Sequence, residues 1–115
     1  MSETDGPNGY KHYGAVKGGH DGTIAPYAMI ACLPFVPNLS QEGIATMTKK
    51  YANKIWGRYG FTSGFNRDRG WYSKEYVGIH EGLLALMLEN YHSGFVWKIM
   101  MDSPVVRTGM RKAKL

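Results

Sequence analysis

Two segments of the chain are apolar on every side that a helix would present. Residues 24–33 read IAPYAMIACL, and residues 80–91 are dominated by leucine and methionine. A helix without a polar face belongs in the interior of a protein. Pro26 is compatible with the first turn of the first segment, where its missing N–H is not needed. The pattern therefore predicts two interior helices, 24–33 and 80–91.

Residues 41–56 have the spacing of an outer, amphipathic helix. The apolar positions recur at steps of three or four residues: Ile44, Met47, Tyr51 and Ile55. Lysines and other polar residues occupy the remaining positions. Pro34 and Pro37 prevent the preceding helix from continuing, and Ser40 is placed to cap the new helix by accepting a backbone N–H bond.

The remaining segments are predicted as loops and shorter helices. Residues 1–23 are rich in glycine and lack an apolar period, which predicts an irregular segment. Residues 57–78 form a second loop, rich in glycine and aromatic side chains, and loops of this length in compact domains are often functional. Interior and outer helices joined by such loops indicate an all-α domain.

The end of the chain divides at Gly94. We expect an apolar helix over residues 95–101 that ends near Asp102, and a last, basic helix that begins at Pro104. Just before the division, Glu89 and Asn90 are predicted to hold neighbouring segments by hydrogen bonds, because buried polar groups need partners.

The size and charge of the chain limit its function. A chain of 115 residues forms one modest domain, and 14 basic against 9 acidic side chains leave it positively charged. The basic residues gather near the C-terminus, where cations favour a helix end. Nucleic acid is a weaker explanation, because the cations are not interleaved with exposed aromatic side chains. Cys32 is a single cysteine in an apolar run, which predicts a small buried side chain.

Other classes of protein are not indicated. Residues 1–9 lack the apolar core of a signal peptide, and no stretch is apolar enough to span a membrane. The chain as written is therefore expected in the cytoplasm, and in the periplasm or outside the cell if a region precedes it. The four histidines lack the spacing of a zinc site, and no phosphate-binding loop occurs, so we predict neither a metal nor a cofactor.

Four stretches carry a resemblance to a known family. They read GHDGTIAPYAMIACLPFVPNLSQEGI, IWGRYGFTSGFN, GWYSKEYVGIHEG and LMLENYHSGFVWKIMM, and together they run from His20 to Met101. In order and spacing they resemble the ending of the glucoamylase-like glycoside hydrolases that include endo-β-1,2-glucanases. The resemblance implies that residues 24–115 are part of a glycoamylase-like domain, preceded by the glycine-rich segment 1–23. The domain would be about the last third of an (α/α)6 toroid with alternating inner and outer helices.

The resemblance also implies a function, which is hydrolysis or binding of glucan oligosaccharides. Many members carry an aspartate followed by glutamine and glycine where this chain has His80, Glu81 and Gly82. Glycoside hydrolysis ordinarily needs two carboxyl groups. The candidates are Glu81 and Asp21, each expected at the start of an interior helix, and His80 could assist as an acid or base. An acidic residue in a first helical turn is also favourable for the helix dipole alone.

The loops offer a mixture of side chains suited to sugars. Flat aromatic rings pack against the C–H faces of a sugar, and amide or charged groups bond its hydroxyls. The candidate substrate contacts are His20, Asn66, Arg67, Trp71 and Tyr72. Trp71 and Tyr72 are preferred because this loop borders the cavity in the family. The alternative is that the aromatic side chains only fix the loop to the core.

Two further readings of the function stay open. The chain could be a carbohydrate-binding remnant without catalysis, or, less favoured, a basic nucleic-acid-binding module. The implied partner is a glucan substrate, with neither nucleic acid nor membrane. A slice of a toroid would expose apolar surface, so we expect self-association. The resemblance implies a chain that is incomplete and inactive by itself.

Overall fold

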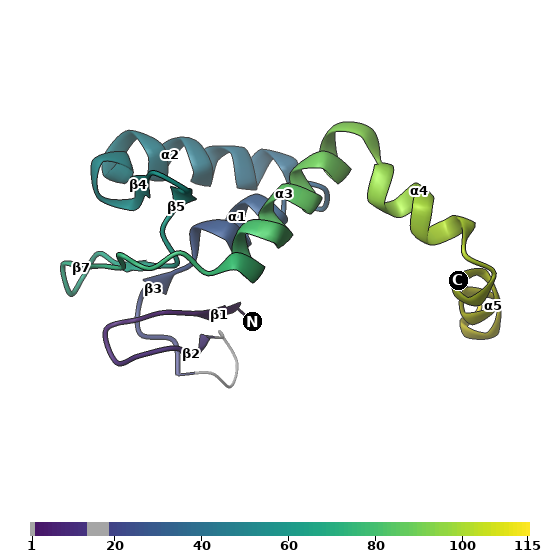
Figure 1. Cartoon of the computed structure of the whole chain (residues 1–115), viewed down its shortest axis with the longest axis horizontal. Coiled ribbons are helices and arrows are strands. Elements are labelled where there is room, and N and C mark those ends of the chain that lie inside the picture. Colours follow the sequence, from purple (N-terminus) through teal and green to yellow (C-terminus); the bar gives the residue numbers. More distant parts are fainter. Residues whose placement is uncertain (1, 14–18) are drawn as a thin grey trace.

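The computed structural model describes residues 2–13 and 19–115 (Figure 1). Five helices make up most of the described chain: α1 (Pro26–Ala31), α2 (Pro37–Ile55), α3 (Gly78–Ser93), α4 (Phe95–Asp102) and α5 (Pro104–Ala113). Seven short strands lie before and between them: β1 (Ser2–Thr4), β2 (Lys11–Tyr13), β3 (Thr23–Ile24), β4 (Trp56–Gly57), β5 (Gly60–Phe61), β6 (Phe65–Asn66) and β7 (Trp71–Tyr72). The prediction of a mainly helical chain is therefore confirmed, with small strands added.

Three helices begin with proline in the first turn, at Pro26, Pro37 and Pro104. The ring fixes a helical φ, and the missing N–H costs nothing at a position that has no acceptor within the helix. The predicted cap at Ser40 is wrong, because α2 starts three residues earlier and Ser40 lies buried inside it. The sequence analysis placed Pro37 before this helix, whereas Pro37 is the first residue of α2.

The core lies where α1, α2 and the loop after α2 meet. Its buried side chains are Ile30, Leu33, Met47, Ile55, Phe61 and Phe65. Tyr51 and Tyr72 pack against this cluster, and their rings lie 5.2 Å and 6.1 Å from the ring of Phe65. The prediction of an amphipathic helix over residues 41–56 is confirmed, because Met47 and Ile55 are the apolar side chains that α2 buries.

The segments predicted as loops contain the strands. β6 pairs with both β3 and β7 in an antiparallel sheet, and β4 pairs with β5 in a hairpin. In the N-terminal segment, β1 pairs antiparallel with β2, so Glu3 lies opposite His12. The prediction of irregular structure over residues 1–23 is wrong for these strands, and residues 1 and 14–18 of that segment lie outside the described part. Strands of two or three residues are too short to show an alternating pattern.

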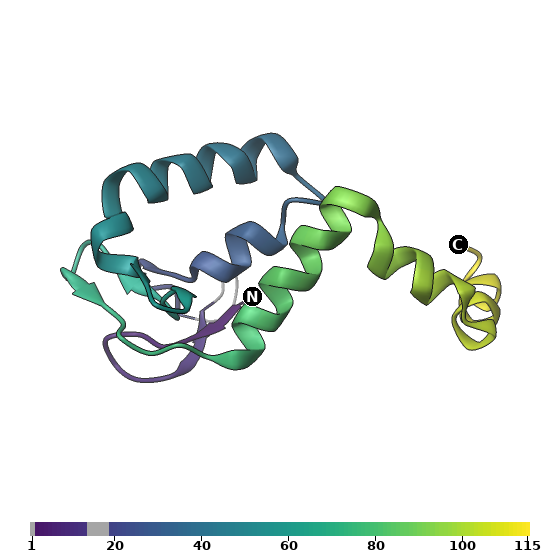
Figure 2. The ribbon, with the colours of Figure 1, turned by 45° about the horizontal axis from the view of Figure 1, so that its top comes forward.

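The two predicted interior helices are buried less than expected. α1 covers only residues 26–31 of the predicted 24–33, and it packs against α3 (Figure 2). Cys32, predicted to be buried, is exposed. Over residues 80–91 the prediction of burial is wrong, because α3 buries His80 and Asn90 while its leucines at 83, 86 and 88 are exposed. The physical reason is that α1 covers one side of α3 and leaves the others open.

The chain turns sharply at Gly94, as predicted. Gly94 adopts a left-handed conformation with φ 69°, which ends α3 and opens α4. The amide side chain of Asn90 supports this turn by accepting a hydrogen bond from the Trp97 backbone N–H, with N···Oδ1 3.0 Å. Ser93 Oγ donates to Glu89 Oε1 at 2.6 Å. The predicted structural role of Asn90 is therefore confirmed, as are the two predicted C-terminal helices. The prediction for Glu89 is wrong, because its side chain is exposed and bonds to Ser93 of the same helix.

Candidate functional site

Glu81 lies in the first turn of α3, where the sequence predicted it, and faces a cleft between α1, α2, α3 and the β4–β5 hairpin. The cleft has a volume of about 490 Å³. Its floor is apolar and includes Leu33, Ile44 and Leu84. Burial in these surroundings raises the pKa of the Glu81 carboxyl above its ordinary value. Glu81 is therefore placed to hold a proton more readily than a free glutamate.

Two polar or aromatic features border the same cleft. Trp56 lies at one side with 59% of its surface exposed, and it contacts Phe61 edge to face at a centroid distance of 4.7 Å. Gln41 Nε2 donates to the Tyr91 hydroxyl at 3.0 Å. The cleft thus combines an exposed indole, a carboxyl group and an amide on an apolar floor.

His80 is placed differently from Glu81, although the two are adjacent in sequence. Its side chain is 3% exposed and stacks on Tyr27, with ring centroids 4.0 Å apart. The Tyr10 hydroxyl lies 3.2 Å from Nε2, and the Ser63 hydroxyl lies 3.5 Å from Nδ1. His80 therefore joins the N-terminal hairpin, α1 and the loop before β6, and direct contact with a substrate would require these neighbours to move.

Asp21 does not stand at the start of a helix, which corrects the prediction, because it precedes β3 and α1 begins five residues later. Its Oδ1 accepts the Thr23 backbone N–H at 3.1 Å, and hydrogen bonding by Thr23 lowers the pKa of the carboxyl below its ordinary value. The Coulombic attraction of Arg69 acts in the same direction. Asp21 Oδ2 is shielded from solvent and makes no hydrogen bond within the described structure. Asp21 therefore stays ionised at pH values where Glu81 binds a proton.

A second cavity, of about 450 Å³, lies beside the strand β3. It is lined by two of the predicted substrate contacts, His20 and Arg67, together with Lys50 and Tyr51. His20 Nδ1 accepts the Gly22 backbone N–H at 3.0 Å. Arg67 donates to Asp68 Oδ1 from Nε and from a terminal nitrogen at 3.0 and 2.9 Å, and this hydrogen bonding raises the pKa of Arg67. The wall of this cavity is partly apolar, and its charged side chains are Lys50, Arg67 and Asp68.

Asn66 is fully buried, and both ends of its amide are bonded to protein. Nδ2 donates to the Asp21 carbonyl oxygen at 2.9 Å and to Thr23 Oγ1 at 3.2 Å, and Oδ1 accepts the Arg69 backbone N–H at 3.0 Å. These bonds fix the turn between β6 and β7 to the segment before β3. The structure thus places Asn66 beneath the cavity wall, where it orients the turn that carries Arg67.

Trp71 and Tyr72 are both half-buried on β7. The Tyr72 ring is parallel to Phe65, with an interplanar angle of 2°, and Lys54 Nζ lies 4.6 Å from its centroid. Tyr72 is thus part of the packing around the core, as the alternative reading of the aromatic loop expected. Trp71 lies opposite Asn66 in the sheet and takes no part in that ring cluster.

The predicted residues do not form one site. His80 and Tyr72 pack against other rings of the protein, and Trp71 lies half-buried on β7. The other five predicted residues form two groups. One contains Asp21 and Asn66, with His20 and Arg67 at the adjoining cavity. The other is the cleft that contains Glu81, and the described contacts do not join it to Asp21. Within residues 2–13 and 19–115, no three His, Cys, Asp or Glu side chains are grouped to hold a metal ion. In the same ranges, no helix has both the length and the apolar character needed to cross a membrane.

Sequence reasoning missed the neighbours of His80 and the exposed position of Trp56. His80 contacts Tyr10, Tyr27 and Ser63, which belong to three separate parts of the chain. The spacing of residues in the sequence does not predict such contacts. Trp56 was read as the last residue of the outer helix. It is the first residue of β4, and the following Gly57 and Gly60 are the available signal for a hairpin.

Comparisons with known proteins identify the family. The family described as "Putative glucoamylase" matches residues 1–104. An exo β-1,2-glucooligosaccharide sophorohydrolase of Parabacteroides distasonis is 30% identical over 92 residues, which are 80% of this chain and 13% of that protein.

Solved structures agree with this match. A putative glucoamylase of Bacteroides uniformis is 32% identical with a TM-score of 0.87, over 96% of this chain and 26% of the other. An endo-β-1,2-glucanase of Chitinophaga pinensis, in complex with sophorotriose and glucose, is 30% identical with a TM-score of 0.87, over 97% and 27%. The chain spans about a quarter of these solved chains, compared with the predicted third. From the family match and these structures we conclude that the chain belongs to the putative glucoamylase family.

Proposed function

We propose that this chain is a segment of a glycoside hydrolase that acts on β-1,2-linked glucan. The relatives named for β-1,2-glucooligosaccharide and β-1,2-glucan hydrolysis support this substrate class. The chain spans 13% of the sophorohydrolase and 26–27% of two solved relatives. The proposed activity therefore requires a larger protein of which this chain is one segment.

The observation that carries the proposal is the position of Glu81. A carboxyl group with a raised pKa, at the edge of an apolar cleft, is suited to donate a proton to the oxygen of a leaving glycosyl group. We assign Glu81 the role of general acid. His80 supports the same turn of α3 from the buried side.

Asp21 is proposed as the second carboxyl group. Its lowered pKa keeps it ionised, which is the state needed in a base or a nucleophile. Two carboxyl groups whose surroundings move their pKa values in opposite directions are typical of an acid and base pair. The described contacts of Asp21 and Glu81 are separate, so a glucan would have to reach from one group to the other.

The substrate contacts are proposed along the cavity beside β3 and on β7. Trp71 offers a half-buried indole for the C–H face of a glucosyl unit, and Tyr72 adds a second ring. His20 and Arg67 offer hydrogen-bond donors to hydroxyls, and Asn66 holds the turn that carries Arg67.

We also propose that α1 and α3 are inner helices and α2 an outer helix of an (α/α)6 toroid. Contact between α1 and α3 supports this arrangement, as does the polar outer surface of α2. In such a ring, the first turn of α3 and the segment before α1 would border one central cavity.

One observation favours a second function, a carbohydrate-binding segment without catalysis. The resemblance implies that many family members carry an aspartate where this chain has His80, and His80 is enclosed by Tyr10 and Tyr27. If catalysis in the family depends on that position, Glu81 cannot replace it without a change of backbone, since adjacent helical residues point about 100° apart.

A chimeric enzyme tests the proposal. The chain would replace the matching 27% of the Chitinophaga pinensis endo-β-1,2-glucanase, and the chimera and the isolated chain would be assayed on linear β-1,2-glucan and on an α-glucan. We expect the chimera to hydrolyse only the β-1,2-glucan and the isolated chain to hydrolyse neither. A folded chimera that binds β-1,2-glucan without hydrolysing it would support the binding function instead.

A further inference from the structure

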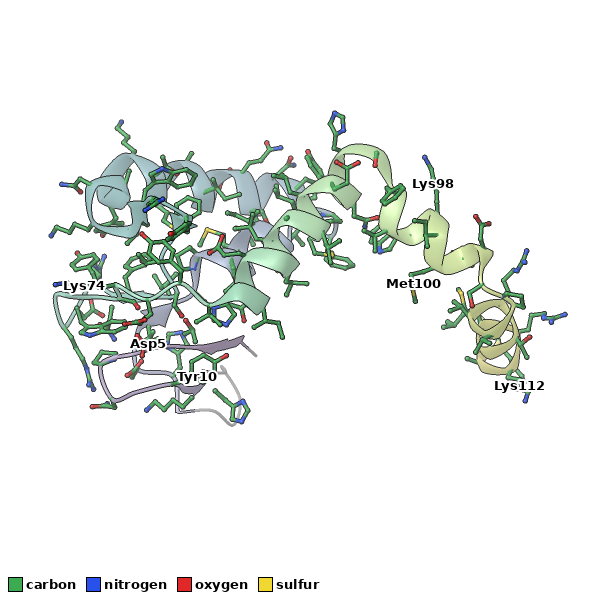
Figure 3. The ribbon with its side chains drawn as sticks, in the orientation of Figure 1. Asp5, Tyr10, Lys74, Lys98, Met100 and Lys112 are labelled. Carbon is green, nitrogen blue, oxygen red and sulfur yellow. The ribbon has the colours of Figure 1, made fainter. Side chains whose placement is uncertain are left out.

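The first turn of α3 is covered on the side of the N-terminal hairpin. Tyr10 lies on this hairpin, below the start of α3 in Figure 3, and its hydroxyl lies 3.2 Å from His80 Nε2. The His80 ring also stacks on Tyr27, so His80 is enclosed. Glu81, the next residue, lines the cleft of about 490 Å³, and His80 does not. A sugar that approaches the Glu81 carboxyl group therefore has to enter this cleft.

Trp56 is the most exposed aromatic side chain that lines this cleft. It is 59% exposed, although tryptophan is highly buried on average. Its indole contacts the ring of Phe61 edge to face, with centroids 4.7 Å apart, and Phe61 belongs to the buried core. Trp56 and Phe61 are also partners in the register of β4 and β5. The indole is thus anchored to the core while much of its surface remains accessible.

The β4–β5 hairpin brings the indole and the Glu81 carboxyl group to the same cleft. A Cβ atom on Gly60 would lie 3.3 Å from Glu81 Oε2, so the carboxyl group lies close to the backbone of β5. Gly60 has a φ of 101°, which favours glycine, and it pairs with Gly57, the residue after Trp56. One short hairpin therefore contacts the carboxyl group and carries the indole.

An indole beside a carboxyl group suits a β-linked glucosyl unit. A flat aromatic ring stabilises a bound sugar by packing against its C–H groups. A β-linked glucopyranose ring holds its large substituents in the equatorial plane, so it presents C–H groups on both faces. An α-linkage is axial and projects from one face, which hinders close packing of a ring on that face. A carboxyl group at the edge of the stacked sugar can then contact the linkage oxygen.

We propose that Trp56 is the stacking surface for the glucosyl unit whose linkage oxygen receives the proton of Glu81. This inference rests on the proposed function, to which it adds the sugar contact of the Glu81 cleft. The competing explanation for the exposed indole is that the rest of a larger protein covers it, because this chain spans only 26–27% of two solved relatives. The two explanations differ in whether the indole is accessible before a glucan binds.

The test compares variants of the chimera with the Chitinophaga pinensis enzyme, each combined with Glu81→Gln so that turnover does not consume the glucan. Trp56→Ala removes the stacking surface, and Trp56→Phe keeps a smaller ring. Tyr59→Ala is the matched control, because Tyr59 is 61% exposed in the turn of the same hairpin and contacts Tyr76 edge to face, but does not line the cleft. We expect Trp56→Ala to raise the Kd for linear β-1,2-glucan at least about fivefold by calorimetry. Trp56→Phe and Tyr59→Ala should stay within about twofold of the parent.

Hydroxyl-radical footprinting of the chimera without substitutions gives a second readout, which does not depend on a variant folding. Peptide mapping separates the oxidation of Trp56 from that of Tyr59, which serves as the internal control. In the absence of glucan, both side chains should be oxidised readily. Linear β-1,2-glucan should slow the oxidation of Trp56 relative to that of Tyr59, and an α-glucan should not.

The outcomes separate this proposal from the proposed function. Equal Kd for Trp56→Ala and Tyr59→Ala, or an indole already shielded in the glucan-free chimera, would overturn the stacking role of Trp56. An active chimera with either result would leave the hydrolytic function standing. A chimera that binds β-1,2-glucan without hydrolysing it, and in which the glucan protects Trp56, would contradict the catalysis and support the stacking role. A chimera that binds no β-1,2-glucan would overturn both proposals.

Discussion

The N-terminal hairpin contacts the loop before β6 closely at Gly64. A methyl group added there, in Gly64→Ala, should lower the stability of the protein. A Cβ atom on Gly64 would lie 2.6 Å from the Asp5 carbonyl oxygen and 2.8 Å from Thr4 Oγ1. Both distances are far below ordinary van der Waals contact, and the closer atom is backbone, which cannot turn aside. Gly64→Ala should therefore force β1 away from the body of the protein.

The magnitude follows from the hydrogen bonds that this movement breaks. Thr4 Oγ1 donates to the Ser63 carbonyl oxygen at 2.5 Å, and the Asp5 backbone N–H donates to Ser63 Oγ at 3.2 Å. Ser73 Oγ also donates to Asp5 Oδ2 at 2.9 Å. At about 0.5–1.5 kcal/mol for each bond, Gly64→Ala should lower the free energy of unfolding by roughly 2–4 kcal/mol.

Denaturant unfolding, followed by hydrogen exchange of the β1 and β2 amides, measures this loss. Gly82→Ala is the control, because nothing lies within 4 Å of its added Cβ and the residue is helical. The control should keep or slightly raise the stability, by up to about 1 kcal/mol, since alanine favours a helix over glycine. If Gly64→Ala unfolds at the same denaturant concentration as the parent with its hairpin amides still protected, the argument from close approach is refuted.

Three further predictions concern other parts of the molecule. Trp71→Ala in the chimera should weaken β-1,2-glucan binding by about 1 kcal/mol, roughly fivefold in Kd by calorimetry, and unchanged affinity would argue against the ring as a contact. Burial raises the pKa of Glu81, so its contribution to stability is present at pH below the unfolded value of 4.5 and is lost as the pH rises through the folded value. In thermal melts, the parent should therefore lose stability relative to Glu81→Gln between pH 4 and pH 7, and parallel pH profiles would contradict the assignment. The exposed Cys32 thiol should react with a maleimide in the native protein as fast as in the denatured one, and strong protection would contradict its exposure.

Local signals in the sequence predicted the helix boundaries that depend on backbone chemistry. Pro26 and Pro104 open helices because proline is compatible with a first turn, and Gly94 ends α3 because it adopts a positive φ. Pro37 shows the limit of such signals. A proline can end one segment or begin the next, and only the packing of α2 on the core decides that it begins the helix.

Burial was predicted less well, because it depends on neighbours that the pattern does not specify. The apolar character of α3 indicates an interior helix, yet α1 packs on one side of it, where Tyr27 stacks on His80, and most of its leucines are exposed. Cys32 stands in an apolar run but falls just after α1, on the exposed side of the turn. Periodicity shows which residues favour an interior, and the number of covering segments determines which of them are buried.

The candidate site was predicted in its residues more than in its geometry. Glu81 was placed correctly in the first turn of α3, because the apolar pattern that predicts this helix begins at residue 80. The enclosure of His80 could not be predicted, since Tyr10 and Ser63 lie 70 and 17 residues away in the sequence. Asn66 was predicted as a sugar contact, and only the structure shows that its amide is bonded to Asp21, Thr23 and Arg69.

The most direct test of the proposed function is the turnover of linear β-1,2-glucan by the chimera with and without Glu81→Gln. The amide keeps the shape of the side chain but cannot exchange a proton, so kcat should fall by roughly 100-fold or more while KM stays nearly constant. The Tm of the variant, measured in parallel, establishes that the chimera remains folded. A folded Glu81→Gln chimera that hydrolyses β-1,2-glucan at the parent rate would contradict the assignment of Glu81 as the general acid.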